Sequence, residues 1–421
     1  MNKLNVIIVG SGLAGLTAAR ILREHHNVKV YERGDASTAT GGQGIMIAPN
    51  GVKILESIGY NQTLAGAVPI LGFRTYGKDG AVKEDIDVNL KHKFGADALA
   101  QKRADFRNEL LRLATAPSAE LGIQGSPAQM VFNSPVVALD PEEGIITFED
   151  GSTDSADVVV IVADGVHSRL RKFVLGQDGY ETRKTGLTCY RIAVSVDDAK
   201  KALDGLPLPH WWEPETCKNR LSLIHSGDES ARFVTVYPLS HQTFFNLSCI
   251  AKVNPSNKAL TESWHADADL DQLAELFSDF HEPLRRIINA SMEVKVWELQ
   301  DLEALPTWTR GRTMIIGDAA HAMTPMQGQG ANMGIEDAES LRLLAPGTLR
   351  QDVPAILKLA ESVRKPRVEK VLSETRKAHS RLGVVERMAR NWEFNSSYSG
   401  VEEALDAKRK DQAGLENQFS L

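Results

Sequence analysis

The segment from residue 6 to residue 32 limits the fold of this 421-residue chain more than any other. An unbroken apolar run at 6–9 (VIIV) is typical of a central parallel strand that is covered on both faces. The sequence G-S-G-L-A-G follows at 10–15, and a helical pattern and a second short strand then lead to Glu32. In this order, the glycines allow a tight turn, close approach of a pyrophosphate and close packing of helix on strand. The segment therefore predicts a dinucleotide-binding β-α-β unit.

Glu32 also indicates which dinucleotide binds. A carboxylate at the end of the second strand can accept hydrogen bonds from an unphosphorylated ribose, whereas a ribose 2′-phosphate requires a basic residue. We therefore expect FAD or NAD, rather than NADP, at this unit. The candidate cofactor-binding residues here are Gly10, Gly12, Leu13, Ala14, Gly15, Glu32 and Arg33.

Two further apolar strands lead into a glycine and an aspartate. The run 157–163 (DVVVIVA) precedes Asp164 and a glycine, and the run 314–316 (MII) precedes a glycine and Asp318. Ligands of open α/β sheets bind at the carboxyl ends of the strands, so three such ends favour one extended cofactor site. Taken alone, the segment 313–338 is also compatible with an ordinary glycine-rich connection that binds nothing.

The loop after Asp318 has the composition of a ligand-binding loop. Asp318 can accept hydrogen bonds from sugar hydroxyls, and Gly328 and Gly330 let a ligand approach the bare backbone. A helix is expected to begin near Ala331, and the amides of its first turn favour negative charge.

Two other segments allow both a ligand-binding and a structural interpretation, and a third is given a structural interpretation only. Gly44, in GGQG at 41–44, allows either backbone approach to a flat ligand or a plain turn into a strand. Arg103 opens an expected helix and is either a solvated charge or a partner for a phosphate or carboxylate. The RKPR sequence at 364–367 lies in the long charged helices expected after residue 353 and is most simply a solvated helix end.

Composition narrows the partners and the compartment. Acidic and basic residues are interleaved and the net charge is −7, which favours neither nucleic acid nor an anionic membrane surface. The apolar runs have the length of strands, too short for a signal-peptide core or a transmembrane helix. Cys189, Cys217 and Cys249 are odd in number and far apart, which fits a reducing, cytoplasmic location and forms no metal or C-x-x-C redox motif.

Taken together, the motifs resemble those of the class A flavoprotein monooxygenases, the group of the para-hydroxybenzoate and salicylate hydroxylases. The resemblance spans nearly the whole chain. It rests on four motifs in order: 10–15 with Glu32, the helix that Arg103 opens, 163–169 (ADGVHSR) and the segment 317–338.

The resemblance implies how the adenosine side of the cofactor is held. The 10–15 turn and Glu32 would bind the ADP half of FAD, and Arg103 would lie along the cofactor. Asp164 would belong to a segment linked to both FAD and the pyridine nucleotide.

On the flavin side, the resemblance implies that Asp318 binds the ribityl chain. Pro325 would face the flavin edge where O2 reacts. The residues whose backbone would lie beside the flavin ring are Gly328, Gly330, Ala331 and Asn332.

The resemblance also implies a reaction. NADPH or NADH would reduce the flavin, O2 would add to form a C4a-hydroperoxyflavin, and one oxygen atom would pass to a phenolic or other electron-rich aromatic or heteroaromatic substrate. Arg191, His225 and Tyr237 are candidate catalytic residues beside Pro325, because their strands are expected to face the flavin, although each has an equally good structural reading. Two alternatives stay open: epoxidation of an indole or alkene in secondary metabolism, and a flavin-binding redox sensor without turnover.

The expected architecture is an α/β fold with an inserted sheet. Alternating strands from about 180 to 250 predict a mostly antiparallel sheet, which would bind the substrate, within a Rossmann-type FAD-binding domain. The expected limits are 1–175 for the first part of the FAD-binding domain, with short β insertions around 70–98, 176–290 for the substrate-binding sheet, 291–345 for the second part of the FAD-binding domain, and 346–421 for a C-terminal helical region.

Overall fold

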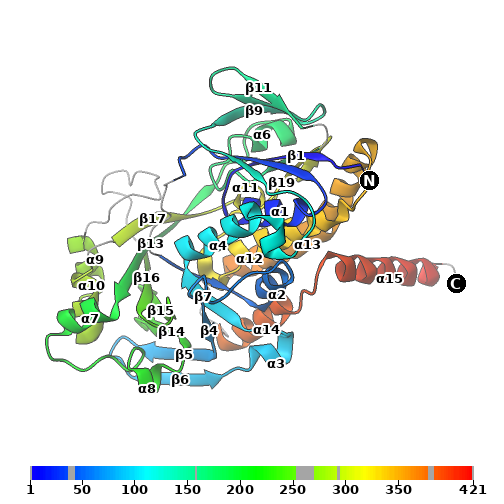
Figure 1. Cartoon of the computed structure of the whole chain (residues 1–421). Coiled ribbons are helices and arrows are strands. Elements are labelled where there is room, and N and C mark those ends of the chain that lie inside the picture. Colours follow the sequence, from blue (N-terminus) through cyan, green and yellow to red (C-terminus); the bar gives the residue numbers. More distant parts are fainter. Residues whose placement is uncertain are drawn as a thin grey trace.

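Two large sheets organise the structure, a computed structural model that describes residues 2–36, 43–156, 159–252, 270–291, 294–377 and 384–419. Figure 1 shows a six-stranded sheet wrapped by helices beside a seven-stranded sheet, with the helices between residues 353 and 396 packed along the first body. This arrangement confirms the expected α/β fold with a second, mostly antiparallel sheet.

The six-stranded sheet carries the predicted β-α-β unit. Its strand order is β18-β19-β12-β1-β2-β8, and every neighbouring pair is parallel except β18 with β19. The strands β1, β12 and β19 are adjacent, so the three glycine-bearing ends predicted to converge do lie at one edge of the sheet. The strands are β1 (Asn5–Val9), β2 (Asn27–Tyr31), β8 (Gln129–Val131), β12 (Val159–Val162), β18 (Thr309–Arg310) and β19 (Thr313–Ile315).

Glycines permit the close packing at this edge. Gly10 has φ +104°, and a Cβ there would lie 2.3 Å from the carbonyl oxygen of Ala163 at the end of β12. A Cβ on Gly15 would lie 2.1 Å from the Gly10 carbonyl oxygen, so only glycine lets helix meet strand here. The packed helices of this body are α1 (Leu13–Leu22), α2 (Pro49–Ser57), α4 (Arg103–Thr115), α5 (Ser118–Leu121), α6 (Arg171–Leu175), α11 (Asp318–His321) and α12 (Gly330–Ser340), with the 3-10 turns η1 (Pro325–Gln327), η2 (Leu341–Leu343) and η3 (Arg350–Asp352).

The seven-stranded sheet is assembled from three parts of the chain. Its order is β17-β13-β16-β15-β14-β5-β6, and all pairs are antiparallel except β14 with β5. The expected domain limits divide it, because β5 and β6 fall within 1–175 and β17 falls within 291–345. Local patterns do not reveal pairing partners, and these strands supply hydrogen bonds to the otherwise open edges of β14 and β13. The strands are β5 (Gly72–Gly77), β6 (Val82–Asp87), β13 (Arg183–Ser195), β14 (Arg220–His225), β15 (Phe233–Leu239), β16 (Phe244–Lys252) and β17 (Val294–Asp301).

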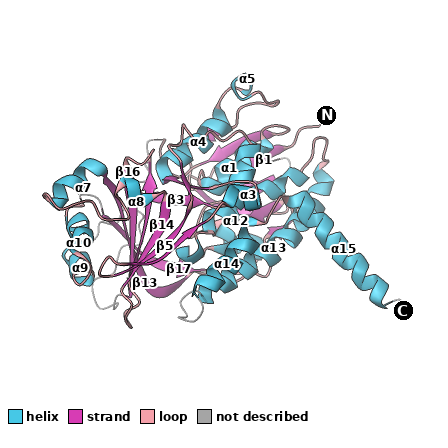
Figure 2. Ribbon diagram, turned by 90° about the horizontal axis from the view of Figure 1, so that it is seen from below, coloured by secondary structure: helices cyan, strands magenta, loops and turns pink. Residues whose placement is uncertain are grey.

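Helices cover one face of this sheet and leave the other toward the cofactor body (Figure 2). The covered face holds a compact apolar cluster that contains Trp211, Trp212 and Phe245, and the Trp212 and Phe245 rings stack 4.3 Å apart. The two tryptophans therefore belong to the core of the covered face. The covering helices are α7 (Val196–Leu203), α8 (Pro214–Cys217), α9 (Leu270–Leu276) and α10 (Glu282–Asn289).

Two small sheets complete the β structure. The first, β3-β7-β4, lies between the two bodies, and the second, β9-β10-β11, is antiparallel. Their bounds are β3 (Gly44–Ile47), β4 (Val68–Ile70), β7 (Ala98–Lys102), β9 (Val136–Asp140), β10 (Ile145–Phe148) and β11 (Thr153–Ser155), and the short helix α3 is Leu90–Phe94.

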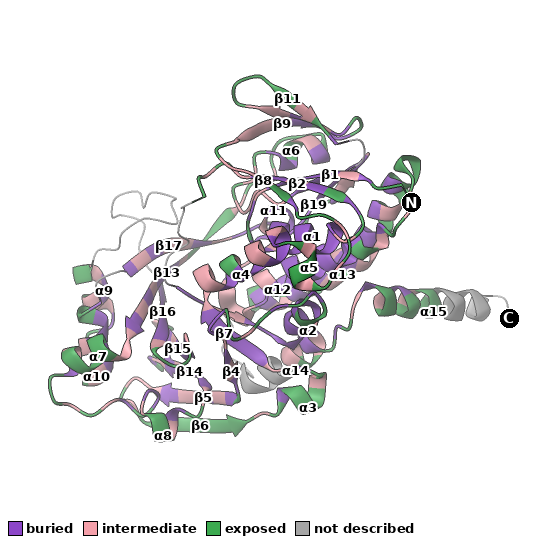
Figure 3. Cartoon of the chain, viewed as in Figure 1, coloured by how far each residue is buried: buried purple, intermediate pink, exposed green. Residues whose placement is uncertain are grey.

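The first C-terminal helix is built into the core. Helix α13 (Val353–Lys377) packs against α12, and Figure 3 shows buried residues along both. The expectation of a solvated helix end at 364–367 is wrong, because Arg364 lies in the middle of α13 and is fully buried. Helix α14 (Val384–Ser396) follows, and α15 (Val401–Phe419) projects from the body (Figure 2). Among the described helices, none combines the length and the apolar composition that crossing a membrane requires.

Candidate cofactor and substrate site

The first turn of α1 faces open space at the end of β1. Gly12 precedes the helix, no described side chain caps it, and no described atom lies within 4 Å of the position that a Cβ on Gly12 would take. Leu13 is buried below the turn, while Ala14 packs against Gly317. The free amides of this turn and the helix dipole suit a pyrophosphate in that space.

Glu32 is placed to bind a ribose. Its Oε2 accepts hydrogen bonds from the Ser11 amide at 2.8 Å and the Ser11 hydroxyl at 2.7 Å, and its Oε1 accepts one from the Gly34 amide at 2.9 Å. Burial opposes ionisation, but these bonds and Arg107 outweigh it and hold the pKa of Glu32 below its usual value. The Oε1 atom can accept a second donor, such as a ribose hydroxyl. Arg33 is exposed beside it.

Asp164, at the end of β12, has one carboxylate oxygen that no described residue hydrogen-bonds. Its Oδ2 accepts the Arg169 amide at 3.0 Å, while Oδ1 is buried and has no hydrogen-bond donor among the described residues. Burial raises the pKa of Asp164. A ligand hydroxyl or amide would satisfy this oxygen, which fits a cofactor lying across the strand ends.

Arg171, which sequence reasoning missed, anchors the same segment. It is buried and donates to the carbonyl oxygens of Ala319 at 2.7 Å, Tyr180 at 2.9 Å and Val166 at 3.1 Å. It therefore joins the β12 end to α11. The only sequence signal was its position after ADGVHSR.

Asp318 and Arg103 approach each other from different elements. Asp318 opens α11 and is half-buried, and a Cβ on Gly330 would lie 3.9 Å from its Oδ1. Arg103 opens α4, where its amide donates to the Gln43 carbonyl at 2.8 Å. Burial lowers the pKa of Arg103 to about 10, against the attraction of Asp318. The pair supplies both signs of charge beside the glycine-rich loop.

The Gly44 segment serves as a packing element between the two sheets. A Cβ on Gly44 would lie 2.7 Å from the Asn246 Cβ and 2.8 Å from the Tyr237 ring, and the Gly44 amide donates to Asn246 Oδ1 at 2.9 Å. The absence of a side chain at Gly44 is thus accounted for by contact with the seven-stranded sheet. Asn332 joins the same segment to the glycine-rich loop: its Oδ1 accepts the Ala48 amide at 2.9 Å, and its Nδ2 donates to the Gly328 carbonyl at 2.8 Å.

Register places the three candidate catalytic residues on one face of the seven-stranded sheet. Opposed residues of antiparallel strands share a face, and the pairs are Arg191 with Ser248, Ser248 with Thr235, His225 with Phe233 and Tyr237 with Asn246. Thr235, Phe233 and Tyr237 alternate on β15 and so point the same way. This is the face that Gly44 contacts.

The cofactor loop also meets this face. Pro325 is half-buried at the start of η1, and the next residue, Met326, packs against a buried cluster of Cys189, Ile250 and Leu299. The Arg191 guanidinium lies 4.1 Å from the centre of the Trp297 ring, and its Nε is buried without a hydrogen-bond acceptor in the described part of the chain.

Arg191 and His225 stand apart. Two strands, β16 and β15, separate them, which at about 4.8 Å per strand gives roughly 14 Å. The His225 ring lies 5.9 Å from the Phe233 ring, and burial lowers the pKa of His225. The two groups can therefore contact opposite ends of a bound molecule but not a single atom.

Comparison with known proteins agrees with this geometry. The family described as FAD binding domain matches residues 3–375. Hispidin-3-hydroxylase from Neonothopanus nambi is 33% identical over 386 residues, which cover 89% of this chain and 88% of that protein. The 6-hydroxynicotinate 3-monooxygenase from Bordetella bronchiseptica is 31% identical over 382 residues, with 88% and 90% covered. A solved substrate complex of salicylate hydroxylase has the same fold, with a TM-score of 0.74 at 24% identity over 96% of this chain and 97% of that one.

Proposed function

Because this chain belongs to the FAD-binding-domain family that includes the class A flavoprotein monooxygenases, we propose that it hydroxylates an electron-rich aromatic or heteroaromatic molecule. The protein is an FAD-dependent monooxygenase that uses NAD(P)H and O2. Two relatives are named for hydroxylation of hispidin and of 6-hydroxynicotinate. The observation that carries the proposal is the contact between the cofactor loop at Met326 and the sheet face that bears Arg191.

The residues at the strand ends fit FAD. The Gly10–Gly12–Gly15 turn would take the pyrophosphate, Glu32 the adenosine ribose and Asp318 the ribityl chain. Bound flavin supplies the chemistry that accepts a hydride and activates O2. The loop at 325–332 would hold the flavin ring, and the apolar clusters that adjoin this loop would keep water from the reacting atoms.

Arg191 and His225 would act on the substrate. A phenol reacts faster as phenolate, and the Arg191 charge, whose Nε has no hydrogen-bond acceptor among the described residues, would stabilise that form. Because burial keeps His225 neutral near pH 7, its free ring nitrogen can accept the phenolic proton. Their separation assigns them to different substrate positions. Tyr237 lies on the same face and contacts the Gly44 segment, so it would shape the flavin side of the chamber.

An apolar end of the same face would select substrate shape. Phe73 on β5 is opposite Leu221 on β14, and the Phe73 ring lies 4.9 Å from the Trp392 ring of α14. These side chains pack in one cluster with Met46, whose methyl group would lie 3.6 Å from a Cβ on Gly328. The cluster thus runs from the cofactor loop to α14, and it favours a planar apolar group on the substrate.

The test is anaerobic flavin reduction followed by aerobic turnover. Purified protein would be reconstituted with FAD and mixed with NADPH or NADH in the presence of a panel of phenols and hydroxypyridines. We expect at least one compound to accelerate reduction and to gain one oxygen atom by mass spectrometry. An epoxide or its rearranged product would instead support epoxidation, and flavin that no donor reduces under any condition would overturn the enzyme proposal.

A cytoplasmic location is part of the same proposal. Cys189, Cys217 and Cys249 are buried free thiols, as expected of a protein in a reducing compartment.

A further inference from the structure

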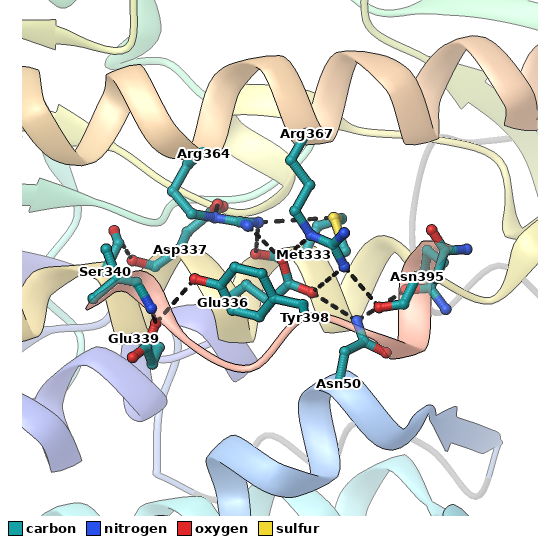
Figure 4. Close-up of polar contacts among 12 residues, drawn as sticks. Asn50, Met333, Glu336, Asp337, Glu339, Ser340, Arg364, Arg367, Asn395 and Tyr398 are labelled. Carbon is teal, nitrogen blue, oxygen red and sulfur yellow. Dashed lines mark hydrogen bonds and ion pairs between the residues drawn. The ribbon is translucent and has the colours of Figure 1, made fainter. Parts of the chain in front are cut away.

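Two adjacent carboxylates on α12 are completely buried and share two arginines of α13 (Figure 4). Arg364 contacts both acids: its Nε lies 3.1 Å from Asp337 Oδ1, and its Nη1 donates to Glu336. Of the two acids, Arg367 contacts Glu336, through Nε at 2.7 Å and Nη2 at 2.9 Å. Burying four charges costs several kcal/mol per ion before pairing. Because ion pairing often does no more than offset this cost, the cluster is weak evidence for a stabilising role, and another role should be considered.

Asp337 reaches from this cluster to the cofactor loop. Its Oδ2 accepts the Gly317 amide at 3.0 Å and lies 2.5 Å from His321 Nε2. Gly317 has φ +61° and ψ −146°, a conformation that favours glycine, and it is the turn from β19 into α11. The next residue is Asp318. The Asp337 carboxylate thus contacts both the Gly317 amide, which precedes Asp318, and His321, the last residue of α11.

Beyond Glu336, the two arginines contact different parts of the fold. Arg364 is the guanidinium that pairs with Asp337, which also contacts His321, so Arg364 acts one contact away from the Gly317 turn. Arg367 instead donates to the carbonyl oxygens of Phe394 at 3.1 Å and Asn395 at 2.7 Å, which anchors α14. A general loss of packing between α12 and α13 would be felt at both positions, whereas an effect on Asp318 would be confined to Arg364.

We infer that Arg364 is a positioning residue for FAD: it fixes the Asp337 carboxylate, which holds the Gly317 turn so that Asp318 meets the ribityl chain. The inference rests on the proposed role of Asp318 as a cofactor ligand. Without Arg364, Asp337 would lose its guanidinium partner and keep His321 and the Gly317 amide beside the Glu336 carboxylate, and repulsion or protonation would release the Gly317 amide. The C-terminal region thus takes part in cofactor binding although it lies outside both expected FAD-binding segments.

The test compares Arg364→Gln with Arg367→Gln as a matched control. FAD binding would be measured by fluorescence titration of the full-length apoprotein, and stability by urea unfolding of the same apoprotein. Loss of a charged hydrogen bond at the Asp318 turn should raise the FAD Kd of Arg364→Gln roughly 10- to 100-fold. The Kd of Arg367→Gln should change less than about threefold, even where the two variants lose similar stability.

Two further variants keep the test decisive. Arg364→Lys should recover part of the FAD affinity and the visible absorption spectrum of bound flavin, because it restores the charge. Asp337→Asn, which keeps the shape but not the charge, should weaken FAD as Arg364→Gln does, and it replaces that variant if Arg364→Gln does not fold. Equal Kd changes at 364 and 367, or wild-type Kd in Asp337→Asn, would overturn the inference. Wild-type protein that binds FAD but hydroxylates nothing would overturn the proposed function alone.

Discussion

Gly12→Ala should separate cofactor binding from folding. Gly12 has φ −72° and ψ −177°, which alanine adopts without strain, and the space for its methyl group is clear of described atoms. A glycine-to-alanine change at such a position stabilises a protein by about 0.4–1 kcal/mol, because the unfolded chain loses conformational freedom. The apoprotein should therefore unfold at the same urea concentration as the wild type or at a slightly higher one.

The same methyl group should weaken FAD. It would occupy the space through which the pyrophosphate approaches the first amides of α1. Loss of one charge-assisted hydrogen bond costs about 1.5–3 kcal/mol, which corresponds to a rise in the FAD Kd of roughly 10- to 150-fold. Fluorescence titration of the apoprotein would measure the Kd, and urea unfolding the stability.

Gly10→Ala is the matched comparison, because this change should lower the stability of the apoprotein whereas Gly12→Ala should not. There the methyl group would lie 2.3 Å from the Ala163 carbonyl oxygen at φ +104°, so the apoprotein itself should lose stability. The reasoning is refuted if Gly12→Ala binds FAD as tightly as the wild type. It is also refuted if Gly12→Ala destabilises the apoprotein as strongly as Gly10→Ala does.

Three further predictions concern single side chains. Asp318→Ala should raise the FAD Kd roughly 10- to 100-fold by equilibrium titration, since a charged acceptor for ribityl hydroxyls is lost; unchanged flavin content would contradict its role. Burial holds the pKa of His225 below its usual value of about 6.5, so the folded state binds fewer protons there and the stability from this group is lost as pH falls below that value. His225→Gln should therefore flatten the acid limb of both urea stability and kcat, and an unaltered acid limb would assign it to another group. Trp392→Ala should raise KM about tenfold for substrates with a second apolar ring but not for single-ring ones, while Glu393→Gln on the exposed side of α14 serves as the control. Equal KM changes for both substrate sizes would contradict the proposal that Trp392 selects substrate shape.

The cofactor motifs were predictable because their chemistry is local. Gly10, Gly12 and Gly15 are dictated by contacts within one β-α-β unit, and the glycine-aspartate ends of β12 and β19 follow strands that periodicity alone reveals. Parallel strands then bring these ends together by a general rule of α/β sheets. The register of the inserted sheet likewise places Arg191 and His225 on one face once the strands are known.

What escaped sequence reasoning depends on distant partners. Arg364 reads as a surface charge because its acids lie on α12, 27 and 28 positions away, and nothing local marks them as buried. Pro366 suggests a helix end, yet α13 continues through it. Pro366 has no N–H to donate to the carbonyl oxygen of Ser362. This oxygen instead accepts a hydrogen bond from Lys408 Nζ of α15 at 3.2 Å, a partner that only the folded chain provides.

The three-part origin of the seven-stranded sheet has a consequence for folding during synthesis. β5 leaves the ribosome long before its partner β14, and β13 cannot gain its β17 neighbour until residue 301 has emerged. Contacts of such long sequence separation form slowly, so the two bodies should fold together and late rather than one after the other. A fragment spanning 176–290 would lack strands at both edges of its sheet and should aggregate, whereas the intact chain closes those edges itself.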